Sequence, residues 1–141
     1  MSTTQPIRSK QLLHDFKEYF LTKQPNSRNY TLILIGLNTA LRINDILHLT
    51  WGDVYCTEHS RFYTHLLITE KKTEKETRIL INRELQETLL SYRKTQPSIA
   101  DTDYLFPSPR KADSPLSRYQ AYRIVRKAAE AVGIEDVIRC H

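Results

Sequence analysis

An arginine with an acidic residue three positions further along begins a short stretch of helical periodicity. Arg42 and Asp45 lie in residues 36–54, GLNTALRINDILHLTWGDV, where apolar residues after Arg42 return at helical spacing. Residues three apart share a helical face, so Asp45 is placed to orient the Arg42 guanidinium. That planar fork of N–H donors suits bidentate binding of a phosphate. On pattern alone, the commoner explanation is a structural ion pair among Arg42, Asp45 and Asp53.

A charged segment between two β-prone runs supplies the next candidates. The runs HLLIT and TRILI flank residues 70–76, EKKTEKE, which predicts a β-hairpin with a charged tip. An ammonium group there, from Lys71, Lys72 or Lys75, has the chemistry to protonate an oxygen that leaves phosphorus. The alternative is a solvated surface turn, which is the usual role of charged hairpin tips.

The last part of the chain predicts a basic amphipathic helix followed by a histidine. From about Ser117 to Val132, apolar residues line one helical face, and Gly133 is placed to end the helix. The opposite face carries Arg118, Arg123, Arg126 and Lys127. This face suits contacts that position a DNA backbone without recognising its sequence, and its alternative is a solvated helix face. His141, taken alone, is ordinarily a surface residue at a chain end.

These features, in this order, resemble the catalytic domain of tyrosine recombinases and phage integrases. The family's first arginine box is T-G-L-R-x-x-E-x-x-x-L-x-W-x-D, and the matching residues are Thr39, Leu41, Arg42, Leu49, Trp51 and Asp53. Ala40 replaces the usual glycine, and Asp45 replaces the usual glutamate. Lys72 best matches the lysine of the family's K-T-G turn, although the glycine is missing. Residues 105–108, LFPS, resemble the L-F-x-S segment, and His141 resembles the histidine of the H-x-L-R box.

The resemblance implies a mostly helical α+β catalytic domain with a small antiparallel sheet or hairpin. It implies that Arg42 and His141 bind the scissile phosphate of double-stranded DNA and that Lys72 serves the leaving oxygen, with Lys71 and Lys75 as alternatives. The implied reaction breaks and rejoins DNA through a 3′-phosphotyrosyl intermediate and uses no metal or nucleotide cofactor. The implied assembly of the full-length protein is a homotetramer on DNA.

Several further elements must position these residues. We expect an amphipathic helix over Lys10–Lys23 and a buried helix through Tyr30–Leu37 that is capped by Asn26. A short helix begins at Arg42 and ends near residue 50. Leu85, Leu89 and Leu90 indicate another helix, and residues 96–115 form a proline-containing connection. The connection contains an expected buried anchor of three residues: Tyr104, Leu105 and Phe106.

Composition narrows the class of protein. A chain of 141 residues with 40% apolar content is sized for one core and one domain. The net charge of +5 favours a polyanionic partner only if the excess is clustered. The start is polar and no run is long enough to span a bilayer, which predicts a cytoplasmic, nucleoid-associated protein. Cys56 and Cys140 predict free thiols, and His14, His48, His59 and His65 lack metal-ligand spacing, so we expect neither disulfide nor metal.

The resemblance also carries an expectation about the extent of the domain. Residues 1–141 are expected to form a single, C-terminally incomplete integrase catalytic domain with no amino-terminal core-binding domain. The family's second arginine and nucleophilic tyrosine follow the histidine box, so we expect this chain to bind DNA without cleaving it. A natural single-domain recombinase and an excised piece of a longer one both fit. The alternative functions are a non-catalytic recombinase-like DNA-binding regulator and a helical adaptor with an unused basic face.

Overall fold

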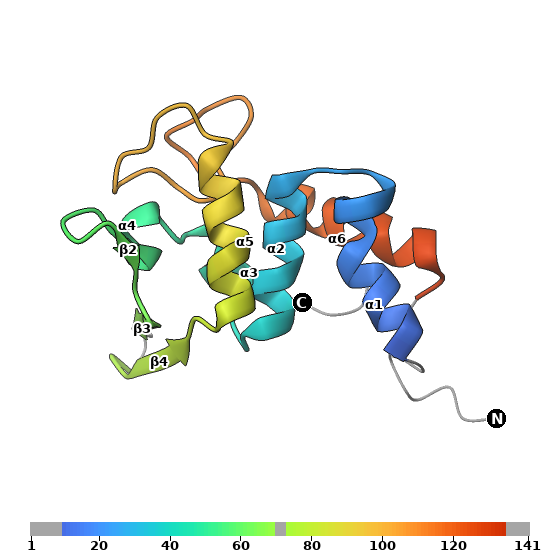
Figure 1. Ribbon diagram of the computed structural model, residues 1–141, viewed down its shortest axis with the longest axis horizontal. Coiled ribbons are helices and arrows are strands. Elements are labelled where there is room, and N and C mark those ends of the chain that lie inside the picture. Colours follow the sequence, from blue (N-terminus) through green and yellow to red (C-terminus); the bar gives the residue numbers. More distant parts are fainter. Residues whose placement is uncertain (1–9, 70–72, 135–141) are drawn as a thin grey trace.

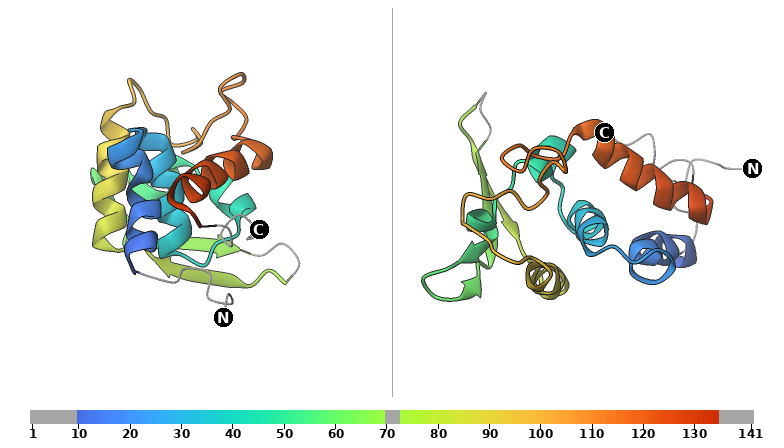
Figure 2. Two further views of the ribbon diagram at one scale, coloured as in Figure 1. Left: turned by 90° about the vertical axis from the view of Figure 1, so that its right-hand side faces the viewer. Right: turned by 90° about the horizontal axis from the view of Figure 1, so that it is seen from above.

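The computed structural model describes residues 10–69 and 73–134, with the strands gathered at one end of a helical body (Figure 1). The helices are α1 (Lys10–Glu18), the π-helix η1 (Tyr19–Lys23), α2 (Ser27–Asn38), α3 (Ile43–Leu47), α4 (Trp51–Val54), α5 (Arg83–Lys94) and α6 (Arg118–Val132). The strands are β1 (Tyr55–Cys56), β2 (Arg61–Phe62), β3 (His65–Thr69) and β4 (Glu76–Leu80). Helices α1 and α6 lie at the opposite end from the strands, and α6 crosses α1 (Figure 2).

The first helix changes its hydrogen-bond spacing near its end. The sequence predicted one amphipathic helix over Lys10–Lys23, whereas the structure has α-helix as far as Glu18 and a π-helical turn after it. The Gln24 amide donates to the Tyr19 carbonyl, five residues back, at 3.0 Å. Pro25 disfavours helical geometry in the residue before it, and the wider turn ends the helix there. Phe16 and Phe20 are both buried by this arrangement.

Helix α2 is the buried centre of the helical body, as its nearly all-apolar sequence predicted. The Asn26 side chain accepts a hydrogen bond from the Asn29 amide at 3.0 Å, which confirms the predicted cap. The buried Thr31 hydroxyl donates to the Ser27 carbonyl at 2.8 Å, so its polarity is satisfied inside the helix. Helix α2 packs on α1, α3 and α5. Because α2 ends at Asn38, its packing also fixes the position of the backbone at Arg42, a few residues further on.

The segment after Arg42 forms two short helices instead of the single helix that was expected. Helix α3 ends at Leu47, and α4 starts at Trp51 with Thr50 as its cap. Between them the backbone is extended by pairing with a distant segment, because the Leu105 amide donates to the Leu49 carbonyl at 3.0 Å. The Trp51 amide donates to the Asp103 carbonyl at 2.9 Å. These long-range bonds outweigh the local helical period.

In the part of the chain that the structure describes, the named strands form two antiparallel hairpins. The predicted hairpin is confirmed as β3 and β4, with Leu66 opposite Ile79 in the register. Leu66 is buried against the helices, whereas Leu67 points outward and is exposed. A second hairpin of β1 and β2 was not predicted, because strands of two residues are too short to show alternation. Helix α4 contacts β3 and links the hairpins to the core.

The predicted anchor in the long connection is confirmed at its two apolar positions. Leu105 and Phe106 are fully buried in the main core, and the Tyr92 hydroxyl donates to the Leu105 carbonyl at 2.5 Å. A second apolar cluster joins α1 to α6, with Phe16 and Phe20 packed on Ala128 and on its neighbour Ala129. Across the described ranges, no helix combines the length and the apolar character needed to cross a bilayer.

Candidate functional site

Arg42 stands at the start of α3, as the sequence predicted. It is the N-cap residue, with extended backbone, and its carbonyl accepts from the Ile46 amide at 3.1 Å. The side chain is exposed. Within residues 10–69 and 73–134, the guanidinium forms no hydrogen bond or ion pair. No residue of these ranges therefore occupies its N–H donors, which face solvent.

The structure does not contain the ion pair that offered the alternative explanation for this segment. Asp45 is half-buried in the first turn of α3 and makes no salt bridge with Arg42 in the described part of the chain. Asp53 has a different partner, because its carboxylate accepts from the Thr50 amide at 2.8 Å and from the Thr50 hydroxyl at 3.1 Å. Asp53 therefore holds the cap of α4 and does not compensate the charge of Arg42.

Other residues of the arginine segment hold the backbone that presents Arg42. The Thr39 hydroxyl donates to the Ile35 carbonyl at 2.8 Å and accepts from the Leu41 amide at 3.3 Å, which shapes the turn between α2 and α3. Trp51 is buried, with its ring 5.5 Å from that of Tyr92. The Arg93 guanidinium lies over the Tyr55 ring at 3.9 Å and over Trp51 at 5.6 Å. These contacts fasten α4 and β1 to α5.

Three of the candidate residues lie outside the described residues: the lysines Lys71 and Lys72, and the histidine His141. The third lysine, Lys75, lies within the described residues and is exposed just before β4. Its backbone N–H donates to the Thr73 hydroxyl at 3.2 Å. Glu74 has a φ of 56°, so a glutamate takes the left-handed conformation in a turn whose expected glycine is missing. The hairpin is thus formed, and Lys75 is on its tip side.

The cations predicted for the basic face of α6 divide into two positions on the helix: Arg123, Arg126 and Lys127 share one side, whereas Arg118 lies on another side in the first turn. All four cations are exposed. None of them forms an ion pair with the acids of the described ranges. Tyr119 adds an exposed ring, 5.7 Å from the guanidinium of its neighbour Arg123. The helix itself is well ended, because Ser117 and Gln120 form a capping box and Gly133 takes a φ of 87°.

The eight tyrosines were not expected to include a nucleophile, and one of them is clearly structural. Burial raises the pKa of Tyr92 to about 12, and its hydroxyl is bonded to the Leu105 carbonyl inside the core. Tyr119 and Tyr122 lie on α6. The Tyr122 hydroxyl accepts a 3.5 Å hydrogen bond from Arg118.

One group of side chains has the types that bind metals. In the β1–β2 turn, Cys56, Glu58 and His59 bring one ligand atom each to within 4.8 Å of one another. The sequence does not indicate this group, because His59 belongs to no paired-ligand motif and the turn between β1 and β2 was not predicted. Cys56 is a free thiol and accepts a hydrogen bond from Tyr63, which raises the pKa of that tyrosine. Cys140 lies outside the described residues.

Known proteins share this fold. The crystal structure of XerA recombinase matches with a TM-score of 0.71 and 22% identity, covering 90% of this chain and 42% of that chain. The fold is thus a mostly helical α+β fold with small antiparallel sheets, similar to that of a recombinase. A curated relative from Bacillus subtilis (strain 168), the probable integrase/recombinase YoeC, is 42% identical over 137 residues, which cover 97% of this chain and 69% of the relative.

The model of the phage integrase family matches residues 5–141, so the chain belongs to that family. The predicted family and fold class are confirmed. The chain spans less than half the length of the XerA recombinase. Membership in a family of integrases and recombinases implies that the chain binds DNA.

Proposed function

We propose that the chain provides the phosphate-binding part of a site-specific DNA breakage and rejoining reaction. A tyrosine oxygen attacks phosphorus in double-stranded DNA and forms a 3′-phosphotyrosyl bond, while the 5′ oxygen leaves and takes up a proton. Because the phosphodiester energy stays in the new bond, another 5′ hydroxyl can reverse the step and rejoin the strands. The reaction needs no metal or nucleotide cofactor. The family match and the YoeC relative support this class of reaction.

The proposal rests on the Arg42 guanidinium, which has no hydrogen-bond or ion-pair partner among the described residues. Negative charge grows on the non-bridging oxygens as the tyrosine attacks, and a guanidinium at the start of α3 stabilises that charge. Asp45, on the same helix, orients the guanidinium once a phosphate is bound. His141 supplies a second hydrogen bond to the phosphate, and Lys72 protonates the 5′ oxygen, with Lys71 or Lys75 as the alternative donor.

The cations of α6 hold the duplex during this reaction. Four exposed cations of α6, Arg118, Arg123, Arg126 and Lys127, provide sequence-independent contacts with backbone phosphates. The full-length recombinase works as a homotetramer on two duplexes. The 141 residues themselves bind DNA but do not cleave it, because all eight tyrosines precede the histidine segment, whereas the family's nucleophile follows it.

The test is a search for a covalent adduct. The chain is incubated with a library of nicked, labelled duplexes of random sequence, and denaturing gels report any protein that stays attached to DNA. We expect salt-sensitive binding by fluorescence anisotropy and no adduct. An adduct mapped by mass spectrometry to one of the eight tyrosines would refute the absence of the nucleophile.

The role of Arg42 is tested by its substitution with glutamine. We expect Arg42→Gln to weaken binding to all duplexes by a similar factor, as for the loss of one phosphate contact. Arg83→Gln is the control, since Arg83 is exposed and carries the same charge at the start of α5. If both variants bind DNA alike, Arg42 is not a phosphate ligand in this chain.

A further inference from the structure

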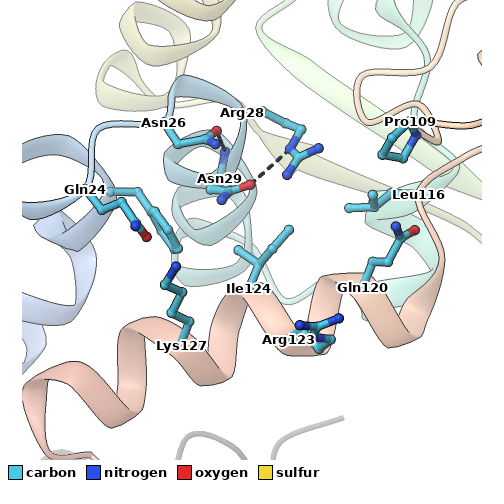
Figure 3. Close-up of a pocket in the computed structure, with 11 residues that line it drawn as sticks. Gln24, Asn26, Arg28, Asn29, Pro109, Leu116, Gln120, Arg123, Ile124 and Lys127 are labelled. Atoms are coloured by element: carbon cyan, nitrogen blue, oxygen red, sulfur yellow. Dashed lines mark hydrogen bonds between the residues drawn. The ribbon is translucent and has the colours of Figure 1, made fainter.

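A hollow of about 490 Å³ lies between α6, the start of α2 and the end of η1 (Figure 3). Its walls carry three cations, from Arg28, Arg123 and Lys127, and no acidic residue of the described ranges lines it. Amide side chains, including Gln24 and Gln120, supply further hydrogen-bonding groups. Unpaired cations around one hollow repel one another, so an anion bound among them is stabilised by all three.

Arg28 is the residue of this hollow that the sequence did not single out. Its Nε donates to the Asn29 side-chain oxygen at 3.0 Å (Figure 3). Asn29 is itself buried, with 7% of its surface exposed, and its backbone N–H donates to the side-chain oxygen of the cap residue Asn26. The guanidinium is therefore held in one orientation through Nε, while its terminal N–H donors have no acidic partner in the described ranges.

The opposite wall comes from α6. Arg123 and Lys127 are four residues apart and so lie on one side of the helix, with Ile124 between them facing α2 (Figure 3). Phe20 and Leu116 are buried beside them and form apolar parts of the lining. The positive end of the α2 dipole adds to the attraction for an anion, since residues of its first turn line the same hollow.

We propose that this hollow binds a phosphate group, and that a backbone phosphate of the bound duplex supplies it, with Arg28 as the principal ligand. This inference rests on the proposed DNA-binding function. Arg123 and Lys127 belong both to the lining of the hollow and to the cations of α6 that are proposed to hold the duplex. A duplex bound along α6 therefore passes beside Arg28, which lines the same hollow.

A free phosphate has the same chemistry, and the experiment separates the two sources. Dissociation constants for a labelled random duplex are measured across a series of KCl concentrations for the parent chain, Arg28→Gln, Arg28→Lys and Arg83→Gln. We expect the logarithmic salt slope of Arg28→Gln to fall by about one unit, as for one lost phosphate contact. Arg28→Lys keeps the charge and should lie between the parent and Arg28→Gln, whereas Arg83→Gln should keep the parent's slope.

Titration calorimetry with inorganic phosphate on the same proteins is the second arm. If Arg28→Gln loses phosphate binding but keeps the salt slope of Arg83→Gln, the ligand is free phosphate and the DNA source is overturned. If Arg28→Gln and Arg83→Gln agree in both measurements, the hollow is not a phosphate site. A parent chain that binds no DNA would refute the proposed function, and the calorimetry would still decide the hollow. Circular dichroism and melting curves confirm that each variant is folded.

Discussion

At the scale of single residues, the arginine segment divides into side chains that hold the backbone and one that reaches solvent. Thr39 and Asp53 hydrogen-bond to nearby backbone, and Trp51 is buried beside Tyr92. Arg42 is exposed and has no side-chain partner in residues 10–69 and 73–134. The structural residues therefore fix where the guanidinium stands, and the guanidinium remains available for a phosphate.

Asp53→Ala should lower stability without touching the proposed ligand of the phosphate. The substitution removes both hydrogen bonds from Thr50 to the carboxylate and so breaks the capping box of α4. We expect the free energy of unfolding to fall by about 1 kcal/mol in urea denaturation. Asp113→Ala, at an exposed loop position, is the control and should change stability by less than about 0.5 kcal/mol. Equal effects of the two substitutions would contradict the capping role.

Tyr92→Phe tests the buried hydroxyl. The Leu105 carbonyl would lose its partner inside the core, so we expect a loss of about 1–3 kcal/mol near pH 7 in urea denaturation.

The same tyrosine predicts a pH dependence. Burial raises the pKa of Tyr92 from 10.0 to about 12. Between these two pH values the folded chain therefore keeps the phenolic proton, whereas the unfolded chain loses it. Stability from this group is complete below about pH 10 and is lost as the pH rises toward 12. The stability difference between parent and Tyr92→Phe should therefore shrink from pH 9 to pH 11.5. A difference that stays constant over this range would show that Tyr92 does not titrate as described.

At the scale of elements, the helices whose ends carry their own signals were predictable. Asn26 caps α2, and Ser117 and Gly133 bound α6 as expected, because a cap is made by residues within a few positions of the helix end. The break between α3 and α4 was not predictable, since it depends on hydrogen bonds to residues 103–105. The β1–β2 hairpin likewise is tied to a distant loop, where the Thr57 hydroxyl donates to Asp101 at 2.7 Å.

The candidate site was predictable to the same extent. Arg42 and the cations of α6 lie on elements with strong local patterns, and the structure places them at the expected helices. Arg28 has no such local pattern, because its significance comes from α6 crossing near the start of α2. The Cys56 group was also missed, because its ligand atoms meet only after the short hairpin forms.

Substitution of a glycine by alanine should have opposite effects at the end of α6 and in the interior of α2. Gly133 has a φ of 87°, so Gly133→Ala forces an alanine into the left-handed region and should cost about 1 kcal/mol. Gly36 lies inside α2, and an added Cβ would meet nothing within 4 Å, so Gly36→Ala should stabilise the protein by roughly 0.5–1 kcal/mol. Thermal and urea unfolding measure both. Shifts of the same sign would contradict the helix geometry described.

At the scale of the whole molecule, positive charge is unevenly paired. The chain carries a net charge of +5, and Lys17 of α1 forms a 2.5 Å ion pair with Glu84 of α5. That contact raises the pKa of Lys17 and ties two helices together. The cations of α6 have no such partners among the described acids. Positive charge without a described acidic partner is therefore gathered on α6, and such clustering is the condition under which a basic protein favours a polyanion.

The most direct test of the account is the salt dependence of DNA binding by two charge-matched variants. One variant replaces the four α6 cations, Arg118, Arg123, Arg126 and Lys127, with glutamine. The other replaces four exposed cations elsewhere, namely Arg83, Lys94, Arg110 and Lys111. If α6 holds the duplex, the logarithmic salt slope should fall by about 0.9 for each lost phosphate contact in the first variant and stay near the parent's value in the second. Equal slopes in the two variants would show that α6 is not the DNA-binding face.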